Sequence, residues 1–167
     1  HLASNSIYQG LCKAAGALGT NLALVHSWTR ACLSAGMLAD DGRCKTLDAS
    51  ADGYVRAEAA MAMILESPNV SEASVLGYLV GSAVNQDGRS SALTAPNGPS
   101  QQEVIRSALL FGDLSASEVD HLQMHGTGTP LGDPIELGAA TAVFMKGNVR
   151  GTPLQLTSAK SFMGHAE

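Results

Sequence analysis

The sequence of 167 residues has few cations, few aromatic residues and no long apolar run, and the first and last of these shortages each argue against a class of protein. Ten lysines and arginines stand against 15 aspartates and glutamates, and this net charge of -5 argues against a nucleic-acid-binding protein. No apolar run approaches the roughly 20 residues that cross a bilayer, so we expect no membrane span. Aromatic residues make up only 4%, while the 18 glycines suit close contact between helices and a sheet.

The sequence also lacks a disulfide framework. Its cysteines, Cys12, Cys32 and Cys44, are odd in number, and no two of them have the C-x-x-C spacing. We therefore expect reduced thiols with a packing role. Such thiols are typical of a cytoplasmic protein, or of an organelle stroma if the parent protein carries a transit peptide.

Neither end of the sequence has the features of a natural terminus. Residues 1–6 contain no initiator methionine, no basic region and no apolar core of a signal peptide. Glu167 falls within a loop-like motif. We expect the chain to be a single partial domain, residues 1–167, of a larger protein.

Hydrophobic periodicity predicts strands that alternate with helices, which indicates an α/β fold with largely parallel pairing. We expect helices over residues 2–17 and 28–38. Residues 55–65 are apolar at nearly every position, so they fit a strand or a helix equally. The predicted strands span residues 21–25, 75–84, 119–124 and 153–157. Residues 85–89 and 93–99 are predicted to be polar, glycine-containing loops.

Two capping boxes predict the starts of further helices. Ser100 with Glu103 predicts a helix from Ser100 that ends at Gly112. Asp133 with Glu136 predicts a second helix, which has a proline at its first position. Its apolar residues repeat at helical spacing, so it should bury one face.

The residues best suited to chemistry follow two predicted strands. Residues 125–136, HGTGTPLGDPIE, begin with His125, and residues 160–167, KSFMGHAE, contain His165. Because parallel strands end at the same edge of a sheet, we expect the two imidazoles to converge. Two neutral imidazole N–H groups directed at one oxygen can stabilise an enolate or an oxyanion.

Other polar residues in these segments have two possible roles each. The hydroxyls of Thr127 and Thr129 can bind a polar chain in the pocket, or they can cap the next helix. Lys160 and Glu167 can fix the orientation and protonation of His165, or they can be solvated surface charges.

Zinc binding is a further alternative, because five potential ligands lie in this region. None has the short spacing of an H-E-x-x-H motif, so we expect no metal and treat a metal-dependent hydrolase as a remote alternative. The potential ligands are His125, Asp133, Glu136, His165 and Glu167.

Together, the segments 125–136 and 160–167 resemble the ketosynthase domain of the β-ketoacyl synthase family. The resemblance continues upstream through DGRCKT, ADGYVR, VNQDGR and LTAPNGPSQQ, which begin at residues 41, 51, 84 and 93. The second and fourth of these resemble polyketide synthases more than animal fatty acid synthases. The sequence departs from the family at Gln123-Met124, where Glu-Ala is commoner, and at Ala57 and Ala59, where glycines are usual.

The resemblance implies a thiolase-like fold with layers in the order α/β/α/β/α. Residues 1–80 would form the end of its N-terminal half and residues 81–167 the start of its C-terminal half. It also implies decarboxylative Claisen condensation between an acyl thioester and a malonyl-type thioester. The implied partners are an acyl carrier protein, which carries substrates on 4′-phosphopantetheine, and a second copy of the parent protein. No directly bound cofactor is implied.

The resemblance also implies roles for individual residues. His125 and His165 match the two catalytic histidines, and Lys160 matches the lysine that supports them. Thr127 and Thr129 match positions that contact the pantetheine arm.

Glu167 matches a buried carboxylate in the loop of the second histidine. No residue of the chain matches the nucleophilic cysteine of the family. That cysteine belongs to a motif expected just upstream of His1, so the chain alone should be inactive in condensation. A non-catalytic ketosynthase-like domain, used for dimerisation or acyl-chain transfer, is the alternative.

Overall fold

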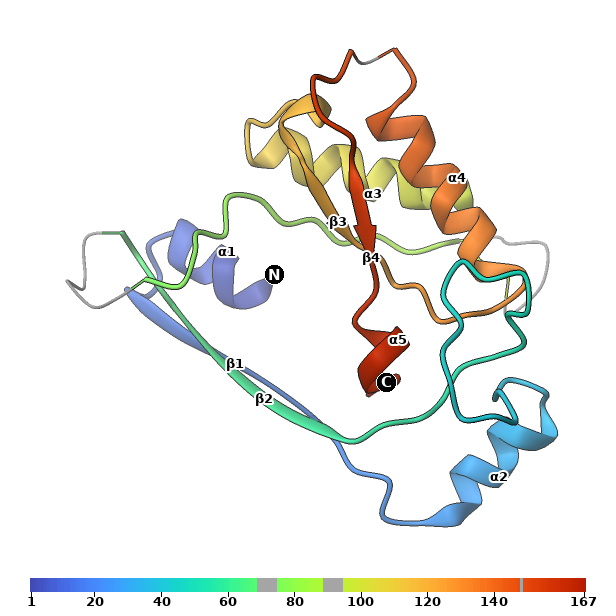
Figure 1. Ribbon diagram of the computed structural model, residues 1–167. Coiled ribbons are helices and arrows are strands. Elements are labelled where there is room, and N and C mark those ends of the chain that lie inside the picture. The colour runs from blue at the N-terminus through green and yellow to red at the C-terminus, as the bar shows by residue number, and fades with distance from the viewer. Residues whose placement is uncertain (69–74, 89–94, 148) are drawn as a thin grey trace.

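The computed structural model describes residues 1–68, 75–88, 95–147 and 149–167 (Figure 1). It mixes helices and strands, which confirms the α/β class. The elements in chain order are α1 (Leu2–Tyr8), β1 (Ala14–Asn21), α2 (His26–Ser34), β2 (Ala59–Glu66), α3 (Gly98–Phe111), the 3₁₀ turn η1 (Ala116–Glu118), β3 (His121–Gln123), α4 (Gly132–Phe144), β4 (Gln155–Thr157) and α5 (Lys160–Met163). No helix within these ranges is long and apolar enough to cross a membrane.

A β–α–β unit forms the best-packed part of the molecule. Strands β3 and β4 pair in parallel, with Leu122 opposite Leu156, and α4 connects them. This pairing confirms the predicted strands at 119–124 and 153–157, although each is shorter than expected. Helices α3 and α4 lie side by side against the pair (Figure 1). The core between these elements contains Ala140, Val143 and Phe144, with Ile105, Leu109, Leu122 and Leu154 packed around them.

A long antiparallel ribbon of β1 and β2 extends to one side of this unit (Figure 1). The helix predicted over 2–17 is therefore wrong beyond Tyr8. Gly10 ends α1 with a φ of +72°, a left-handed conformation that glycine adopts without strain. The strand predicted over 21–25 is also wrong, since β1 ends at Asn21. Within the ambiguous segment 55–65, residues 59–65 belong to a strand, β2, whereas residues 55–58 lie before it.

Two further predictions need correction. Helix α2 ends at Ser34 rather than at residue 38, and Gly36 follows with a φ of +67°. Residues 75–84 form no strand, because no other strand of the described residues pairs with them. This segment instead packs on the end of α3, where a Cβ at Gly81 would lie 2.4 Å from the Ala108 carbonyl oxygen.

Helix α3 begins two residues before its predicted start. Asn97 is the N-cap, and its side chain accepts a hydrogen bond from the Ser100 amide at 3.2 Å. The predicted capping box is therefore wrong, since the Ser100 hydroxyl donates to the Gln86 carbonyl at 2.9 Å. The predicted end at Gly112 is confirmed. Residues 89 and 93–94 of the predicted loops lie outside the described residues.

Candidate active site

His125 and His165 lie together beyond the ends of β3 and β4. Their ring centroids are 5.3 Å apart, and the ring planes meet at 84°, so the edge of one ring faces the other. The parallel pairing of the strands brings both chain segments to one edge of the sheet. The predicted convergence of the two imidazoles is thus confirmed as geometry.

Two carboxylates of α4 fix the loop that carries His125. Glu136 accepts hydrogen bonds from the amides of His125 at 2.5 Å and Gly126 at 2.9 Å. Asp133, which is buried, accepts from the amides of Gly128 at 3.1 Å and Leu47 at 2.8 Å. The predicted capping box is therefore wrong, because these side chains bind the preceding loop instead of the helix start.

Thr129 caps α4 instead. Its hydroxyl accepts a hydrogen bond from the Gly132 amide at 3.1 Å. The Thr127 side chain lies beside it, with 3.4 Å between the two hydroxyl oxygens, and Thr127 is buried. For Thr129, the structure thus shows the helix-capping role that the sequence left as one of two alternatives.

The loop between α2 and β2 holds the His125 loop from the opposite side. The Thr46 hydroxyl donates to the Gly126 carbonyl at 2.6 Å, and the Gly53 amide donates to the Gly128 carbonyl at 3.0 Å. Gly128 has a φ of +79°, and a Cβ there would lie 2.5 Å from the Lys45 nitrogen. Only glycine fits so close to a neighbouring backbone.

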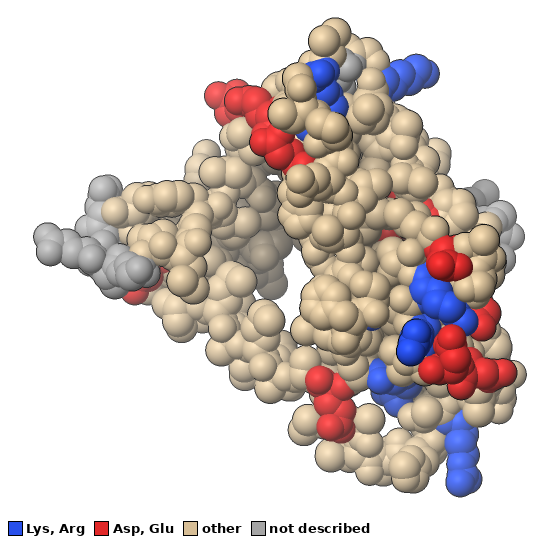
Figure 2. All heavy atoms as spheres, in the orientation of Figure 1, with Lys and Arg blue, Asp and Glu red and all other residues tan. Residues whose placement is uncertain are grey.

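Charged residues brace this loop at the surface. Lys45 contacts Asp41 at 3.2 Å and Asp52 at 2.6 Å. Figure 2 shows cations and anions gathered at the right of the molecule, over the loop between α2 and β2. Because all three side chains are partly exposed, each pair contributes little stability alone. Lys45 thus combines these surface contacts with a backbone nitrogen that lies close to Gly128.

The backbone of His165 is clamped between two neighbouring residues. Its amide donates to the Val55 carbonyl at 2.8 Å, and its carbonyl accepts from the Ala57 amide at 2.8 Å. The ring of Tyr54 packs against the imidazole, with 5.2 Å between the centroids. The imidazole Nδ1 accepts a hydrogen bond from the Glu167 amide at 2.9 Å. The proton of the neutral ring is therefore on Nε2.

The surroundings favour neutral imidazoles. Burial is the main cause that lowers the pKa of His125, and the Lys160 cation lowers it further, against the opposing effect of Glu136 and Asp133. Burial and then Lys160 also lower the pKa of His165. Both rings are therefore uncharged at neutral pH. Lys160 acts through its charge, since among the described residues it forms no ion pair.

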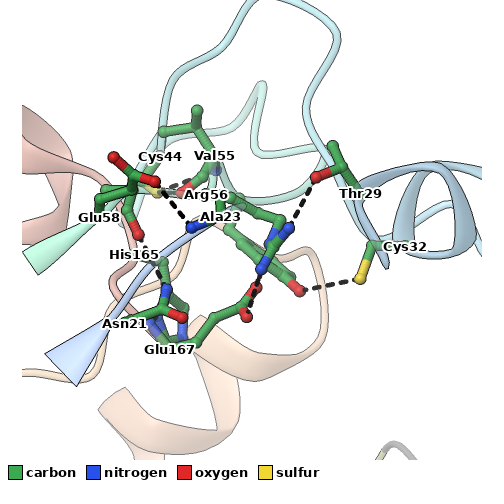
Figure 3. A network of polar contacts seen from close by, with 12 residues as sticks. Asn21, Ala23, Thr29, Cys32, Cys44, Val55, Arg56, Glu58, His165 and Glu167 are labelled. Atoms are coloured by element: carbon green, nitrogen blue, oxygen red, sulfur yellow. Dashed lines mark hydrogen bonds and ion pairs between the residues drawn. The ribbon is translucent and has the colours of Figure 1, made fainter. Parts of the chain in front are cut away.

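Glu167 lies differently from its expected position. The expectation of a buried carboxylate is wrong, because 26% of its side chain is exposed. It binds Arg56 through two hydrogen bonds, of 2.5 and 2.8 Å, and this pairing is the main cause that lowers the pKa of Glu167 (Figure 3). Its cationic partner is thus Arg56, whose place in the ADGYVR motif gave no sign of a link to His165.

The cysteines and the potential zinc ligands form no metal-binding cluster among the described residues. Cys32 and Cys44 are buried, as their packing role predicts, whereas Cys12 is partly exposed. Within the described ranges, no three His, Cys, Asp or Glu side chains come close enough to share a metal ion.

The site as built is a pair of neutral N–H donors beside one cation, an arrangement suited to a developing negative charge on oxygen.

Comparison with protein families identifies the family to which this fold and this histidine pair belong. Residues 1–71 match the N-terminal domain of beta-ketoacyl synthase, and residues 76–167 match its C-terminal domain. The chain belongs to the β-ketoacyl synthase family, which is a family of transferases.

The similar proteins are polyketide synthases. The chain is 47% identical over 171 residues to polyketide synthase GfsA of Streptomyces halstedii, covering 100% of the chain and 2% of that protein. It is 45% identical over 171 residues to erythronolide synthase EryA2 of Saccharopolyspora erythraea, covering 100% of the chain and 5% of that protein. The chain therefore corresponds to a small part of each relative.

Solved structures agree with the fold. The ketosynthase from module 6 of the bacillaene synthase of Bacillus subtilis superposes with a TM-score of 0.94 at 34% identity, over 99% of this chain and 30% of that one. The oxazolomycin ketosynthase domain OzmH KS7 of Streptomyces albus gives a TM-score of 0.93 at 34% identity, over 99% and 29%. The chain thus has the thiolase-like α/β fold of ketosynthase domains, of which it is a fragment.

Proposed function

We propose that this chain is the part of a polyketide synthase ketosynthase that stabilises the anion formed in decarboxylative Claisen condensation. The observation that carries the proposal is the pair His125 and His165, whose rings lie 5.3 Å apart and whose pKa values are both lowered. Neutral imidazoles donate N–H groups to an oxyanion without protonating the carbanion. Residues 1–80 would be the end of the N-terminal half of the domain and residues 81–167 the start of its C-terminal half.

The malonyl-type thioester loses CO₂, and the electron pair of the broken C–C bond becomes an enolate whose oxygen accepts the two imidazole N–H groups. The enolate carbon then attacks an acyl thioester on a cysteine, which forms the new C–C bond and releases the thiolate. Lys160 lowers the pKa of both histidines and adds positive potential toward the enolate.

The nucleophile in this proposal is a cysteine outside the chain, so the chain alone is inactive in condensation. Two of its own cysteines are already bound in the interior. The Cys44 sulfur accepts a hydrogen bond from the Val55 amide at 3.3 Å, and the Tyr54 hydroxyl lies 3.9 Å from the Cys32 sulfur. Both thiols are buried, so they are out of reach of an incoming acyl thioester.

The substrates in this proposal arrive on the 4′-phosphopantetheine of an acyl carrier protein, and the parent domain is a homodimer. The similarity to polyketide synthases supports both. Thr127 and Thr129 are the residues proposed to contact the arm, and the Thr129 hydroxyl keeps its own proton to donate while it accepts the bond from α4.

The test uses a complete ketosynthase domain that contains this segment, with acyl and malonyl groups supplied on carrier protein. His125→Ala and His165→Ala should each abolish C–C bond formation but leave acyl transfer to the enzyme. The control is His121→Ala, since His121 is exposed and bonds only Thr157 of β4 among the described residues. Full condensation by either site variant would refute the proposal, and acyl transfer without condensation in the wild type would favour a non-catalytic domain.

A further inference from the structure

Arg56 connects three segments around His165. It follows Val55, and an isolated parallel bridge joins Arg56 to His165. Its guanidinium donates to both oxygens of Glu167 and, at 2.6 Å, to the hydroxyl of Thr29 on α2 (Figure 3). Only 9% of the Arg56 side chain is exposed, against 26% of the Glu167 side chain, and the bond to Thr29 is the part-buried one of the three.

The fork of the guanidinium fixes Glu167 in one orientation. Two parallel N–H···O bonds constrain the position and the plane of the carboxylate, which a single contact would leave free to rotate. The bond to Thr29 fixes the guanidinium in turn. Glu167 is therefore held at its side chain, although its residue as a whole is exposed.

Glu167, which Arg56 holds, is also the residue that determines which nitrogen of His165 carries the proton. The Glu167 amide donates to His165 Nδ1 at 2.9 Å, which keeps the ring proton on Nε2, the nitrogen that is left to face a substrate. Rotation of Glu167 would remove this donor. The imidazole would then exchange between its two tautomers, and only one of them presents an N–H at Nε2.

We propose that Arg56 is a positioning residue that acts through Glu167 to hold His165 in its Nε2–H tautomer. The inference rests on the proposed function, because it concerns one of the two imidazoles that act there. Arg56 touches no reacting atom. Its role is geometric, so a residue that has the same charge without the planar fork should not replace it.

The experiment uses the complete ketosynthase domain with ¹⁵N-labelled histidine. Arg56→Gln should lower kcat by about 10-fold to 100-fold, as loss of a partner that orients an active-site ligand commonly does, with KM nearly unchanged. The ¹⁵N spectrum of His165 should change from one tautomer to a mixture. Arg56→Lys should resemble Arg56→Gln, and Glu167→Gln, which retains its amide and one acceptor oxygen, should lose less. Arg43→Gln, at an exposed arginine, is the matched control.

The outcomes separate this inference from the proposed function. A folded Arg56→Gln variant with wild-type kcat and a single Nε2–H tautomer would overturn the inference. If that variant does not fold, the same result with Arg56→Lys would overturn it, because the lysine lacks the fork. Full condensation by His165→Ala would instead defeat the proposed function, and the spectrum, which needs no activity, would still report on the tautomer.

Discussion

Glu136 binds the backbone of His125 directly, with its Oε1 atom 2.5 Å from the His125 nitrogen. Its second oxygen accepts from the next amide, Gly126, so one carboxylate satisfies two successive donors. Both bonds are charge-assisted, and such bonds are worth more than neutral ones. The helix α4 thus determines where the His125 loop lies.

Replacing this carboxylate should loosen the His125 loop. Glu136→Gln retains one acceptor but turns an amide N–H₂ toward a backbone N–H, and a part-buried donor left unpaired, such as the Gly126 amide, costs about 1–3 kcal/mol. We expect a lower urea midpoint with an unchanged m-value, together with a lower kcat. The control is Glu103→Gln on the exposed face of α3. Equal urea midpoints for the two variants would contradict the assigned role of Glu136.

Gly128 should tolerate no side chain. At its φ of +79° an alanine is strained, and its Cβ would lie 2.5 Å from the Lys45 nitrogen. We expect Gly128→Ala to destabilise the domain by about 1–3 kcal/mol, the cost of a strained backbone residue. Gly138→Ala in α4 is the matched control, since a Cβ there meets nothing within 4 Å and alanine favours a helix. Thermal unfolding of both variants measures the difference, and a Gly128→Ala variant as stable as the control would show that the loop can move away.

The condensation rate should persist below the ordinary histidine pKa of about 6.5. Burial and the Lys160 cation lower the pKa of both His125 and His165, so each ring stays neutral until the pH falls below that value. The acid limb of kcat/KM against pH should therefore have its midpoint below about 6.5. Lys160→Met removes one cause of the lowering, so the midpoint should move to higher pH.

Lys13→Met, at an exposed lysine, is the control for this experiment and should leave the midpoint unchanged. The two profiles are measured as kcat/KM, so that each reports on the free enzyme. A midpoint that moves to lower pH in Lys160→Met would show that Lys160 does not act on the histidines by charge repulsion.

Local patterns are sufficient to predict the β3–α4–β4 unit and the meeting of His125 with His165. The strands are short apolar runs, the helix has a clear buried face, and the parallel connection leaves few alternatives for where the strand ends lie. The same patterns mark Asp133 and Glu136 as important but assign them the wrong role. The reason is that a capping box has the same residues at the same spacing as two carboxylates that bind the preceding loop.

The ribbon of β1 and β2 could not be predicted in the same way. Residues 14–21 are small or apolar except for two polar residues. Their apolar side chains do not repeat at a spacing that distinguishes a strand from a helix. Their partner lies beyond α2, and it is the pairing of Ala14 with Glu66, rather than any local signal, that makes them a strand. The link from Arg56 to Glu167 is equally remote in sequence, so no spacing rule could have indicated it.

The contacts around the two histidines have a consequence for recombining ketosynthases. Thr46, Leu47, Gly53 and Arg56 belong to the region that matches the N-terminal family domain, and each binds a residue in the region that matches the C-terminal one. In a chimera joined near residue 75, the two residues of each of these contacts would come from different parent proteins. Engineers who exchange such halves should transfer residues 44–56 together with the segments that they bind, or choose a junction elsewhere.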